Sequence, residues 1–363
     1  MNHSRPDMAY LAAALEVSAS TVSRALSGKP GVSDRTRRRV AELAHELGYT
    51  VSSSASRLAR GRTNTVGLIV TAPDQWYQSA VIARASAIAH ASGHDVALFN
   101  ISAQDARSTL LGGPHLAGKV DGALVVSTSL LPEEEDALIA AGIPVIGVGT
   151  VLDRFSFVTV DNEAEIATGV RYLLELQHPR IGLIQGAAPA NGVNYVAQER
   201  GNGFQRAMGE HFDPALVIRA AGDDAESGAS ALAALLARGD APTAVIAESD
   251  LLAAGAIQGA RRMGLSVPDD LSVIVFDDSP IAELLELTTI RQDPATQAAH
   301  ATRLLLKALS GVDAPLNFTF QPCSLIVRRT AQVAGGGPSW QAHLPSLRVP
   351  EGAPVDERTT SSG

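Results

Sequence analysis

Two short apolar runs at helical spacing lie near the start of the chain. Residues 8–15 are rich in alanine and leucine, and after a short turn Ser18 can cap a second helix whose apolar positions, from Val22 to Leu26, follow at i, i+3 and i+4. The opposite face carries short hydroxyl side chains and the guanidinium of Arg24. Such a face suits a helix that lies in a major groove, so the pattern predicts a helix-turn-helix.

A third helix is predicted for residues 34–47, with Ser33 as its N-cap and Gly48 as the residue that ends it. Its apolar positions recur at i, i+3, i+4 and i+7 from Val40, which closes a three-helix core. The arginines at positions 35, 37, 38 and 39 have two interpretations. They form either a solvated helix face or a set of phosphate contacts beside the recognition helix.

From Thr65 onward, short apolar strands alternate with amphipathic segments, which predicts parallel sheets covered by helices on both faces. The expected strands are 65–70, 96–99, 123–127, 145–148, 158–160, 181–185, 216–219, 244–247 and 272–276. The expected helices start near 77, 105 and 132 and then span 163–176, 197–208, 227–237, 250–263 and 294–309. The last helix should return the chain to the first of two similar α/β halves. Beyond residue 330, glycine and proline predict a disordered tail.

Charge separates the chain into two parts. Residues 1–62 hold 10 Lys and Arg against 5 Asp and Glu, whereas the remainder holds 19 against 33. Only the first part is therefore suited to nucleic acid. The single cysteine, Cys323, excludes an intrachain disulfide framework and a cysteine-rich zinc site, and is interpreted as a small strand residue. A charged residue in the first apolar run argues against a secretory signal, and no stretch is long enough to span a membrane, so we expect a cytoplasmic protein.

A series of short motifs follows the predicted recognition helix in a fixed order. They are VSASTVSRAL (17–26), GKPGVS (28–33), TR (36–37), ELGY (46–49), GRTNTVGL (61–68), VDG (120–122), GIPV (142–145), VDN (160–162), RGNGF (200–204), FDD (276–278) and LTTIRQD (287–293). Each motif alone is a weak signal, but the ordered succession resembles the lactose-repressor (LacI) family of bacterial regulators across residues 8–330. The resemblance implies a helix-turn-helix domain joined to two doubly wound parallel α/β lobes, similar to the periplasmic-binding-protein type 1 fold.

The resemblance also implies which residues meet DNA. We expect Ala19, Ser20 and Arg24 to face base edges, and Ser18, Thr21 and Ser23 to contact phosphate. In the family a hinge helix inserts an apolar side chain into the minor groove, and Ala55 and Leu58 occupy the matching places. Glu16 stands at the turn position where the family usually has glycine, so the turn is expected to carry some strain.

For a small-molecule effector, the resemblance points to residues at strand ends. Arg200 and Asp277 match the effector-binding arginine and aspartate, and Ser127 and Ser249 hold other cleft positions. An arginine and a carboxylate together suit a polyhydroxylated ligand. The alternatives are a surface salt bridge for Arg200 and a helix cap for Asp277. Asp277 and Asp278 together are also considered as a metal-binding or catalytic carboxylate pair.

Trp76 and Tyr77 follow the first strand of the lobes and could stack on a sugar ring. A hydrophobic helix start is the alternative for both. Three positions depart from sugar-responsive members of the family, because Gly149, Gln198 and Ser249 stand where aspartate, arginine and asparagine are often found. The identity of the effector is therefore open.

These observations predict a sequence-specific transcriptional regulator, a repressor, whose operator affinity is switched by an effector bound between two lobes. The expected domains are 1–49 for the headpiece, 50–62 for the hinge, 63–330 for the effector-binding and dimerisation domain, and 331–363 for the tail. We expect a homodimer on pseudo-palindromic double-stranded DNA, a carbohydrate effector, no cofactor, no metal and no membrane partner. No nucleophile elbow, phosphate loop or metal-ligand spacing indicates an enzyme. The alternative is a solute-binding protein of the same lobe fold without a DNA role.

Overall fold

A computed structural model of the chain describes residues 8–26, 30–47, 62–188, 194–238, 240–312 and 315–335. Contacts divide the chain into two units. One comprises Met1–Asn64 with Gly118–Asp121, and the other comprises Thr65–Ala117 with Gly122–Gly363. The hinge positions Ala55 and Leu58, and Gly48 at the end of the third helix, lie outside the described residues.

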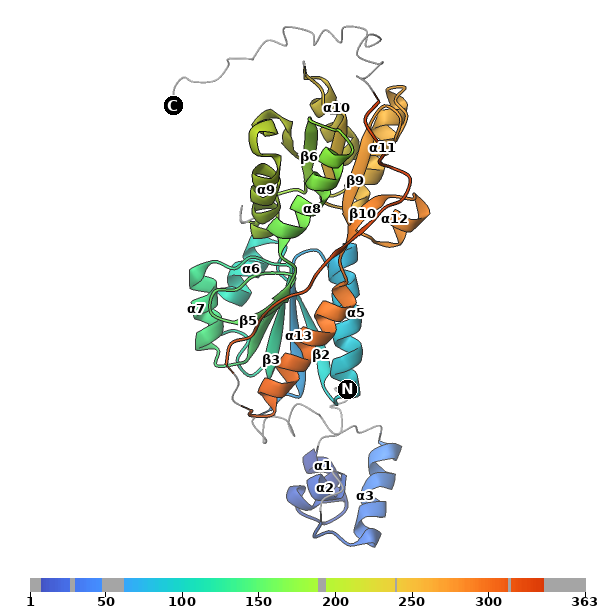
Figure 1. The fold of residues 1–363 in the computed structure, drawn as a ribbon. Coiled ribbons are helices and arrows are strands. Elements are labelled where there is room, and N and C mark those ends of the chain that lie inside the picture. The colour runs from blue at the N-terminus through green and yellow to red at the C-terminus, as the bar shows by residue number, and fades with distance from the viewer. Residues whose placement is uncertain are drawn as a thin grey trace, which may run out of the picture. The chain divides into compact units, whose positions relative to one another are not determined.

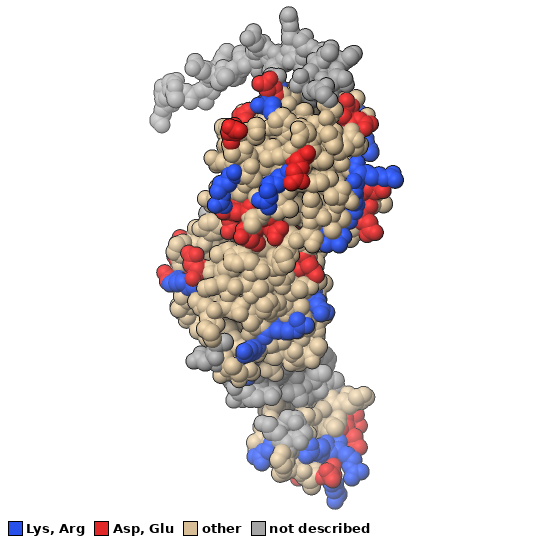
Figure 2. Space-filling model, viewed as in Figure 1, with Lys and Arg blue, Asp and Glu red and all other residues tan. Residues whose placement is uncertain are grey.

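The smaller unit contains three helices, α1 (Met8–Ala14), α2 (Ala19–Leu26) and α3 (Asp34–Glu46), as the apolar spacing predicts. Leu11, Val22 and Val40, one from each helix, are fully buried and form the centre of the core. The Ser33 hydroxyl accepts a hydrogen bond from the backbone N–H of Thr36 at 3.2 Å and so caps α3. This unit carries basic side chains close to a few acidic ones (Figure 2).

Between α1 and α2, Glu16 adopts the left-handed conformation with φ 54°. A residue with a Cβ is less stable there than glycine, which explains why glycine is the usual choice for this turn. The N–H of Glu16 still donates to the carbonyl of Ala13 at 3.2 Å, and that of Val17 donates to Ala12 at 3.0 Å. The turn therefore closes with glutamate in place, as expected.

The first lobe of the larger unit contains a six-stranded sheet in the order β11-β5-β4-β3-β1-β2. Its elements are β1 (Thr65–Val70), α5 (Trp76–Ala91), β2 (Asp95–Asn100), α6 (Gln104–Leu111), β3 (Gly122–Val126), α7 (Pro132–Ala140), β4 (Val145–Val148), β5 (Ser156–Thr159), α13 (Pro294–Leu309) and β11 (Phe318–Phe320). All its strands pair in parallel. Helices α5 and α13 pack side by side on one face (Figure 1).

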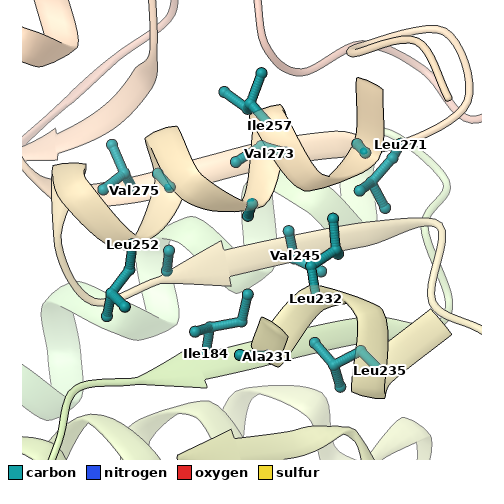
Figure 3. Packing of buried hydrophobic residues seen from close by; sticks show 14 of the residues in the cluster. Ile184, Ala231, Leu232, Leu235, Val245, Leu252, Ile257, Leu271, Val273 and Val275 are labelled. Carbon is teal, nitrogen blue, oxygen red and sulfur yellow. The ribbon is translucent and has the colours of Figure 1, made fainter. Parts of the chain in front are cut away.

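The second lobe contains a six-stranded sheet in the order β12-β10-β9-β8-β6-β7, whose strands pair in parallel except β12, which is antiparallel to β10. Its elements are α8 (Asn162–Glu175), β6 (Ile181–Gln185), α9 (Tyr195–Met208), β7 (Val217–Arg219), α10 (Ala225–Leu236), β8 (Ala244–Ala247), α11 (Asp250–Arg262), β9 (Ser272–Asp277), α12 (Pro280–Leu284), β10 (Thr288–Arg291) and β12 (Ser324–Ile326), with short 3₁₀ turns at Gly209–His211 and Pro214–Leu216. Helices α8 and α9 pack together, as do α10 and α11. Leu232, Val245 and Val273 interdigitate between the sheet and the second pair (Figure 3). Strand β6 is buried along its whole length, which is why its sequence lacks polar alternation.

The chain passes between the lobes three times: after β5, between β10 and α13, and between β11 and β12. The sequence predicted the return through α13, but it gave no signal for β10, β11, β12 or α12. Residues 331–335 also differ from the expected tail. Ala331 is 9% exposed, and the N–H of Ala334 donates to the carbonyl of Leu176 at 2.8 Å. This segment therefore packs against the second lobe.

Within the residues that the structure describes, no helix has the length and apolar character needed to cross a lipid bilayer.

Candidate functional site

The recognition helix α2 buries Val22 and Ala25 and leaves its opposite side open to solvent. Of the six positions in and directly before α2 that are expected to meet DNA, Thr21 is half-buried and the other five are exposed; these are Ser18, Ala19, Ser20, Ser23 and Arg24. The Ser18 hydroxyl accepts from the backbone N–H of Thr21 at 3.2 Å, as the predicted N-cap should. It also lies 2.8 Å from the hydroxyls of Ser20 and Thr21, which gathers three polar groups at the helix start.

A cavity of about 640 Å³ lies between the two lobes of the larger unit. In each sheet the strand order reverses beside the first strand, at β1/β3 and at β6/β8, and ligands bind outside the carboxyl ends of parallel strands at such points. The loops that line the cavity follow these strands: Thr71 after β1, Ser127 after β3, Gly186 after β6 and Glu248 after β8. The fold thus brings together side chains that are far apart in the sequence.

Arg200 and Asp277 both line this cavity, as the sequence predicted. Arg200 is 6% exposed, so it does not form the surface salt bridge that was its alternative. Its Nε donates to Oδ1 of Asn162 at 3.0 Å, its Nη1 donates to the carbonyl of Glu248 at 3.1 Å, and its guanidinium carbon lies 3.7 Å from the centre of the Phe276 ring. These contacts fix the guanidinium plane at the cavity wall.

Asp277 ends β9 with φ 116°, and Asp278 follows with φ 69°. Two successive positive φ values in non-glycine residues mark a strained turn, which is common at binding sites. Asp278 is turned away and pairs with Arg291 and Arg328 at 2.5 and 2.7 Å. Asp277 is not a helix cap, because Ser279 caps α12. The two carboxylates therefore have different partners and do not form a metal or catalytic pair.

Trp76 and Tyr77 line the cavity at the first turn of α5, so they are at once a helix start and part of the cavity wall. The Tyr77 hydroxyl donates to Oε1 of Gln297 on α13 at 2.5 Å. Gly149, one of the three positions where the sequence departs from the expected pattern, lies directly against this ring. A Cβ at position 149 would be 2.6 Å from two atoms of the Tyr77 ring, so the tyrosine fills the space that a side chain there would use.

Of the other positions that the sequence singled out, Ser127 and Ser249 line the cavity and Gln198 does not. Ser127 lines the cavity with φ 45°, and Ser249 lines it while its hydroxyl caps α11 by accepting from the N–H of Leu252 at 3.4 Å. Gln198 is exposed and does not line the central cavity; it borders a separate groove on α9. The departure from the expected pattern at Gln198 therefore concerns that groove and not the central cavity.

Several acidic residues of the cavity were not predicted from the sequence. Glu248 and Asp250 are 7% and 3% exposed, and Asp74 and Asp223 join them with Asp277 along the cavity. Burial raises the pKa of Asp277 to about 7 and that of Asp250 to about 6, and it raises the pKa of Glu248 as well. The polar run Glu-Ser-Asp directly after buried β8 was the available signal for two of them.

The two carboxylate oxygens of Asp250 differ in their hydrogen bonding. Its Oδ2 accepts from the N–H of Ser279 at 2.6 Å, whereas its buried Oδ1 has no hydrogen-bond partner among the residues that the structure describes. A buried acceptor without a partner is costly to the stability of the folded state.

A buried ion pair supports the loop after β3. Nε and Nη2 of Arg107 donate to the two carboxylate oxygens of Glu134, each at 2.6 Å, and Nη2 also donates to the Ser129 carbonyl at 2.7 Å. The Ser129 hydroxyl in turn accepts from the backbone N–H of Tyr195 in the second lobe at 3.1 Å. This arrangement holds the first lobe's cavity loop against the start of α9.

The described residues contain no group of His, Cys, Asp and Glu that could hold a metal ion. A helix-turn-helix unit and a two-lobed unit with a polar cavity together define the class of ligand-responsive DNA-binding regulators. Comparisons with known protein families support the same class. Residues 7–52 match the model of bacterial regulatory proteins of the lacI family, and residues 170–331 match the periplasmic binding protein-like domain. The chain belongs to the LacI family of bacterial transcriptional regulators.

The relatives are similar along almost their whole length. The chain is 32% identical to the transcriptional regulator MalR of Streptomyces coelicolor over 352 residues, covering 91% of this chain and 97% of the relative. It is 30% identical to the transcriptional repressor CytR of Escherichia coli K12 over 319 residues, covering 86% and 92%.

Two solved structures are also similar. The lac repressor dimer bound to operator and the anti-inducer ONPF has a TM-score of 0.76 at 25% identity, covering 91% of this chain and all of that one. A complex of the regulator CelR with cellobiose has a TM-score of 0.66 at 28% identity, covering 90% and all of that chain. The family and fold predictions are therefore confirmed. This is a family of DNA-binding regulators and not of enzymes, and the alternative of a solute-binding protein without a DNA role is wrong.

Proposed function

We propose that the protein is a repressor whose affinity for its operator is switched by a polyhydroxylated effector bound in the cavity between the lobes. The observation that carries this proposal is the meeting of Arg200, Asp250 and Asp277 at one cavity. Fixed donors and acceptors facing one another are what a ligand with many hydroxyl groups requires. The similarity to a regulator solved with cellobiose supports the same class of ligand.

The effector is expected to be uncharged or basic. Five carboxylates line the cavity, whereas Arg107 is neutralised by Glu134 and leaves Arg200 as the lining cation without an ion-pair partner among the described residues. A phosphate or carboxylate placed among these groups would be repelled. Sugars and related polyols are therefore expected to bind better than their phosphorylated forms.

On DNA, we expect a homodimer that places two α2 helices in successive major grooves of a pseudo-palindromic operator. The likeness to the lac repressor dimer bound to operator supports this arrangement. Arg24 is the long side chain on the exposed face of α2, and Arg24→Ala should cost about 1 to 3 kcal/mol of specific binding. A gel-shift titration tests this, with a competitor of random sequence as the reference. Unchanged operator affinity would remove Arg24 from base recognition.

The hinge is expected to act through Leu58, whose side chain would enter the minor groove at the centre of the operator. Leu58→Gly should then weaken specific binding far more than non-specific binding. Ala59→Gly serves as the matched control, because it also adds backbone freedom to the hinge but changes neither Ala55 nor Leu58, the two positions expected to meet the minor groove. Equal losses in both variants would assign the effect to hinge flexibility.

The switch itself is tested by two measurements on the same variants. A thermal-shift screen of the full chain against sugars, sugar phosphates and nucleobases should identify a stabilising compound. Arg200→Ala and Asp277→Asn should abolish the effect of that compound on operator binding and leave operator binding itself unchanged. Full ligand affinity in both variants would remove these residues from the site, and equal ligand affinity for free and DNA-bound protein would contradict the switch.

A further inference from the structure

A chain of hydrogen bonds runs from Asp277 in the second lobe to Tyr77 in the first. Nε2 of Gln292 donates to Oδ1 of Asp277 at 2.6 Å. Nε2 of Gln297 donates to Oε1 of Gln292 at 3.3 Å, and the Tyr77 hydroxyl donates to Oε1 of Gln297 at 2.5 Å. Gln292 lies at the crossover between β10 and α13, and Gln297 lies on α13. These four residues form what we call the interlobe relay.

Every hydrogen bond of the interlobe relay points the same way, and chemistry fixes that direction. An ionised carboxylate can only accept, so Gln292 must turn its amide nitrogen to Asp277 and its oxygen to Gln297. Gln297 must then turn its nitrogen to Gln292 and its oxygen to Tyr77. Gln292 and Gln297 are 7% and 0% exposed, which leaves water little access to exchange for these bonds.

The consequence appears at Tyr77. A phenol has one hydrogen, and in the relay that hydrogen is given to Gln297. Burial raises the pKa of Tyr77 above its usual value, so the hydroxyl keeps this proton. The Tyr77 oxygen is then left with lone pairs alone to offer to a ligand.

Tyr77 and Asp277 both border a small inner cavity of about 140 Å³, lined in addition by Gly149, Arg200 and Gln292. Its size suits a group of a few heavy atoms, such as a hydroxymethyl or aminomethyl group, since a water molecule occupies roughly 30 Å³. Oδ1 of Asp277 is engaged by the relay, and its Oδ2 is not. The two ends of the relay therefore face this cavity as acceptors.

We propose that the interlobe relay makes the inner cavity a subsite that prefers a hydrogen-bond donor of the effector, a hydroxyl or an ammonium group, to a carboxylate or phosphate. Arg200 also borders this cavity, and Asp277 at the same wall offsets its charge. The subsite rests on the proposed function, because it selects among ligands of the same cavity. When a proton binds Oδ1 of Asp277, the oxygen that faces Gln292, the direction of the relay reverses. The acid then donates to Gln292, both amides turn over, and Tyr77 accepts from Gln297 and directs its hydrogen into the inner cavity.

The relay can be tested without a ligand. The pH at which Asp277 titrates depends on the charged and titratable groups near it. These are Arg200 on α9, Glu248 after β8, Asp250 at the start of α11, Tyr77 on α5 and Cys323 before β12. The full chain contains five tyrosines, so labelling their Cζ atoms with ¹³C gives few resonances, and Tyr77→Phe identifies the one of interest. That resonance should shift between about pH 5 and about pH 9 with the midpoint of the Asp277 carboxyl.

Three variants sharpen the measurement. Gln297→Met and Asp277→Asn should each abolish the shift, the first by interrupting the relay and the second by removing the titrating acid. Asp250→Asn is the matched control; it removes a neighbouring negative charge but no member of the relay, so the shift should persist with a lower midpoint. A Tyr77 resonance that stays constant while Asp277 titrates, or a shift that persists in Gln297→Met, would overturn the relay.

The ligand class is tested separately with glucose, glucosamine, glucose 6-phosphate and cellobiose in thermal-shift assays of the wild type and Tyr77→Phe. Glucose, glucosamine or cellobiose should stabilise the wild type more than the phosphate does, and Tyr77→Phe should reduce that advantage. Equal stabilisation by glucose 6-phosphate would overturn the subsite. A panel with no effect beside an intact Tyr77 titration would count against the proposed polyol effector while supporting the relay, so the two failures are distinguishable.

Discussion

Gly149→Ala is expected to be one of the more damaging small substitutions in the first lobe. Gly149 has φ 67°, and an added Cβ would lie 2.6 Å from Cε1 and Cζ of Tyr77. The backbone conformation alone costs a residue with a Cβ about 1 to 2 kcal/mol. The ring must also move, which breaks the hydrogen bond of Tyr77 to Gln297, and the fully buried Gln297 oxygen then lacks its donor at a further cost of about 1 to 3 kcal/mol.

The sum is about 2 to 5 kcal/mol, and a matched control separates its two parts. Gly142 has φ 65°, and a Cβ there would meet no atom within 4 Å, so Gly142→Ala carries the conformational cost alone. Thermal and urea unfolding of both variants should show Gly149→Ala to be the less stable. In the double variant Tyr77→Ala, Gly149→Ala the second change should cost only as much as Gly142→Ala. Equal stability of the two single variants would refute the reasoning.

Three further substitutions test other parts of the molecule. Ser33→Ala should weaken α3 by about 1 kcal/mol through loss of its cap, seen as faster amide exchange in that helix, and exchange unchanged from the wild type would contradict the cap. Arg107→Met should cost about 3 to 5 kcal/mol of unfolding free energy because it leaves the Glu134 carboxylate buried and unpaired, and adding Glu134→Leu should recover most of it; no recovery would show that the pair matters for packing. Burial raises the pKa of Asp277 from 3.8 to about 7, so the folded state binds the extra proton and stability should fall as pH rises through that window. Asp277→Asn should flatten this fall in thermal melts, and an unaltered pH slope would contradict it.

The sequence predicted most of the fold because its strands and helices differ sharply in period and in length. Strand Ile181–Gln185 is a short apolar run that follows Arg180 and ends with Gln185 before a glycine, and the helix Pro294–Leu309 begins with a proline and ends before Ser310 and Gly311. Strands β11 and β12 have three residues each and lie at sheet edges. Such short segments are held by their neighbours rather than by their own pattern, so no periodicity reveals them.

For the cavity, the sequence located residues at strand ends but not the hydrogen bonds among them. Arg200 and Asp277 were found because motifs mark them. Gln292 belongs to one of those motifs, yet its partner Gln297 is one of several polar residues on α13 and has no distinguishing neighbour. The Asp121-Gly122 motif shows the same limit. Asp121 accepts from the N–H groups of residues 63 and 64, and a Cβ at Gly122 would meet Leu305 at 2.9 Å. The role of Asp121 and the need for glycine at position 122 both depend on contacts with residues distant in the sequence, so the motif alone does not explain them.

The position of Gln292 suggests how a change at the cavity would spread through the larger unit. Its neighbour Asp293 caps α13 by accepting from the N–H of Thr296 at 2.9 Å, so adjacent residues of one crossover serve the cavity and the first lobe. Helix α13 packs along α5, and Tyr77 at the start of α5 is joined to Gln297 on α13. A ligand that engages Asp277 therefore acts on two packed helices at both their crossover and their shared hydrogen bond. Because a ligand shifts an equilibrium only by its difference in affinity for two states, these helices are where the two states of the first lobe should differ.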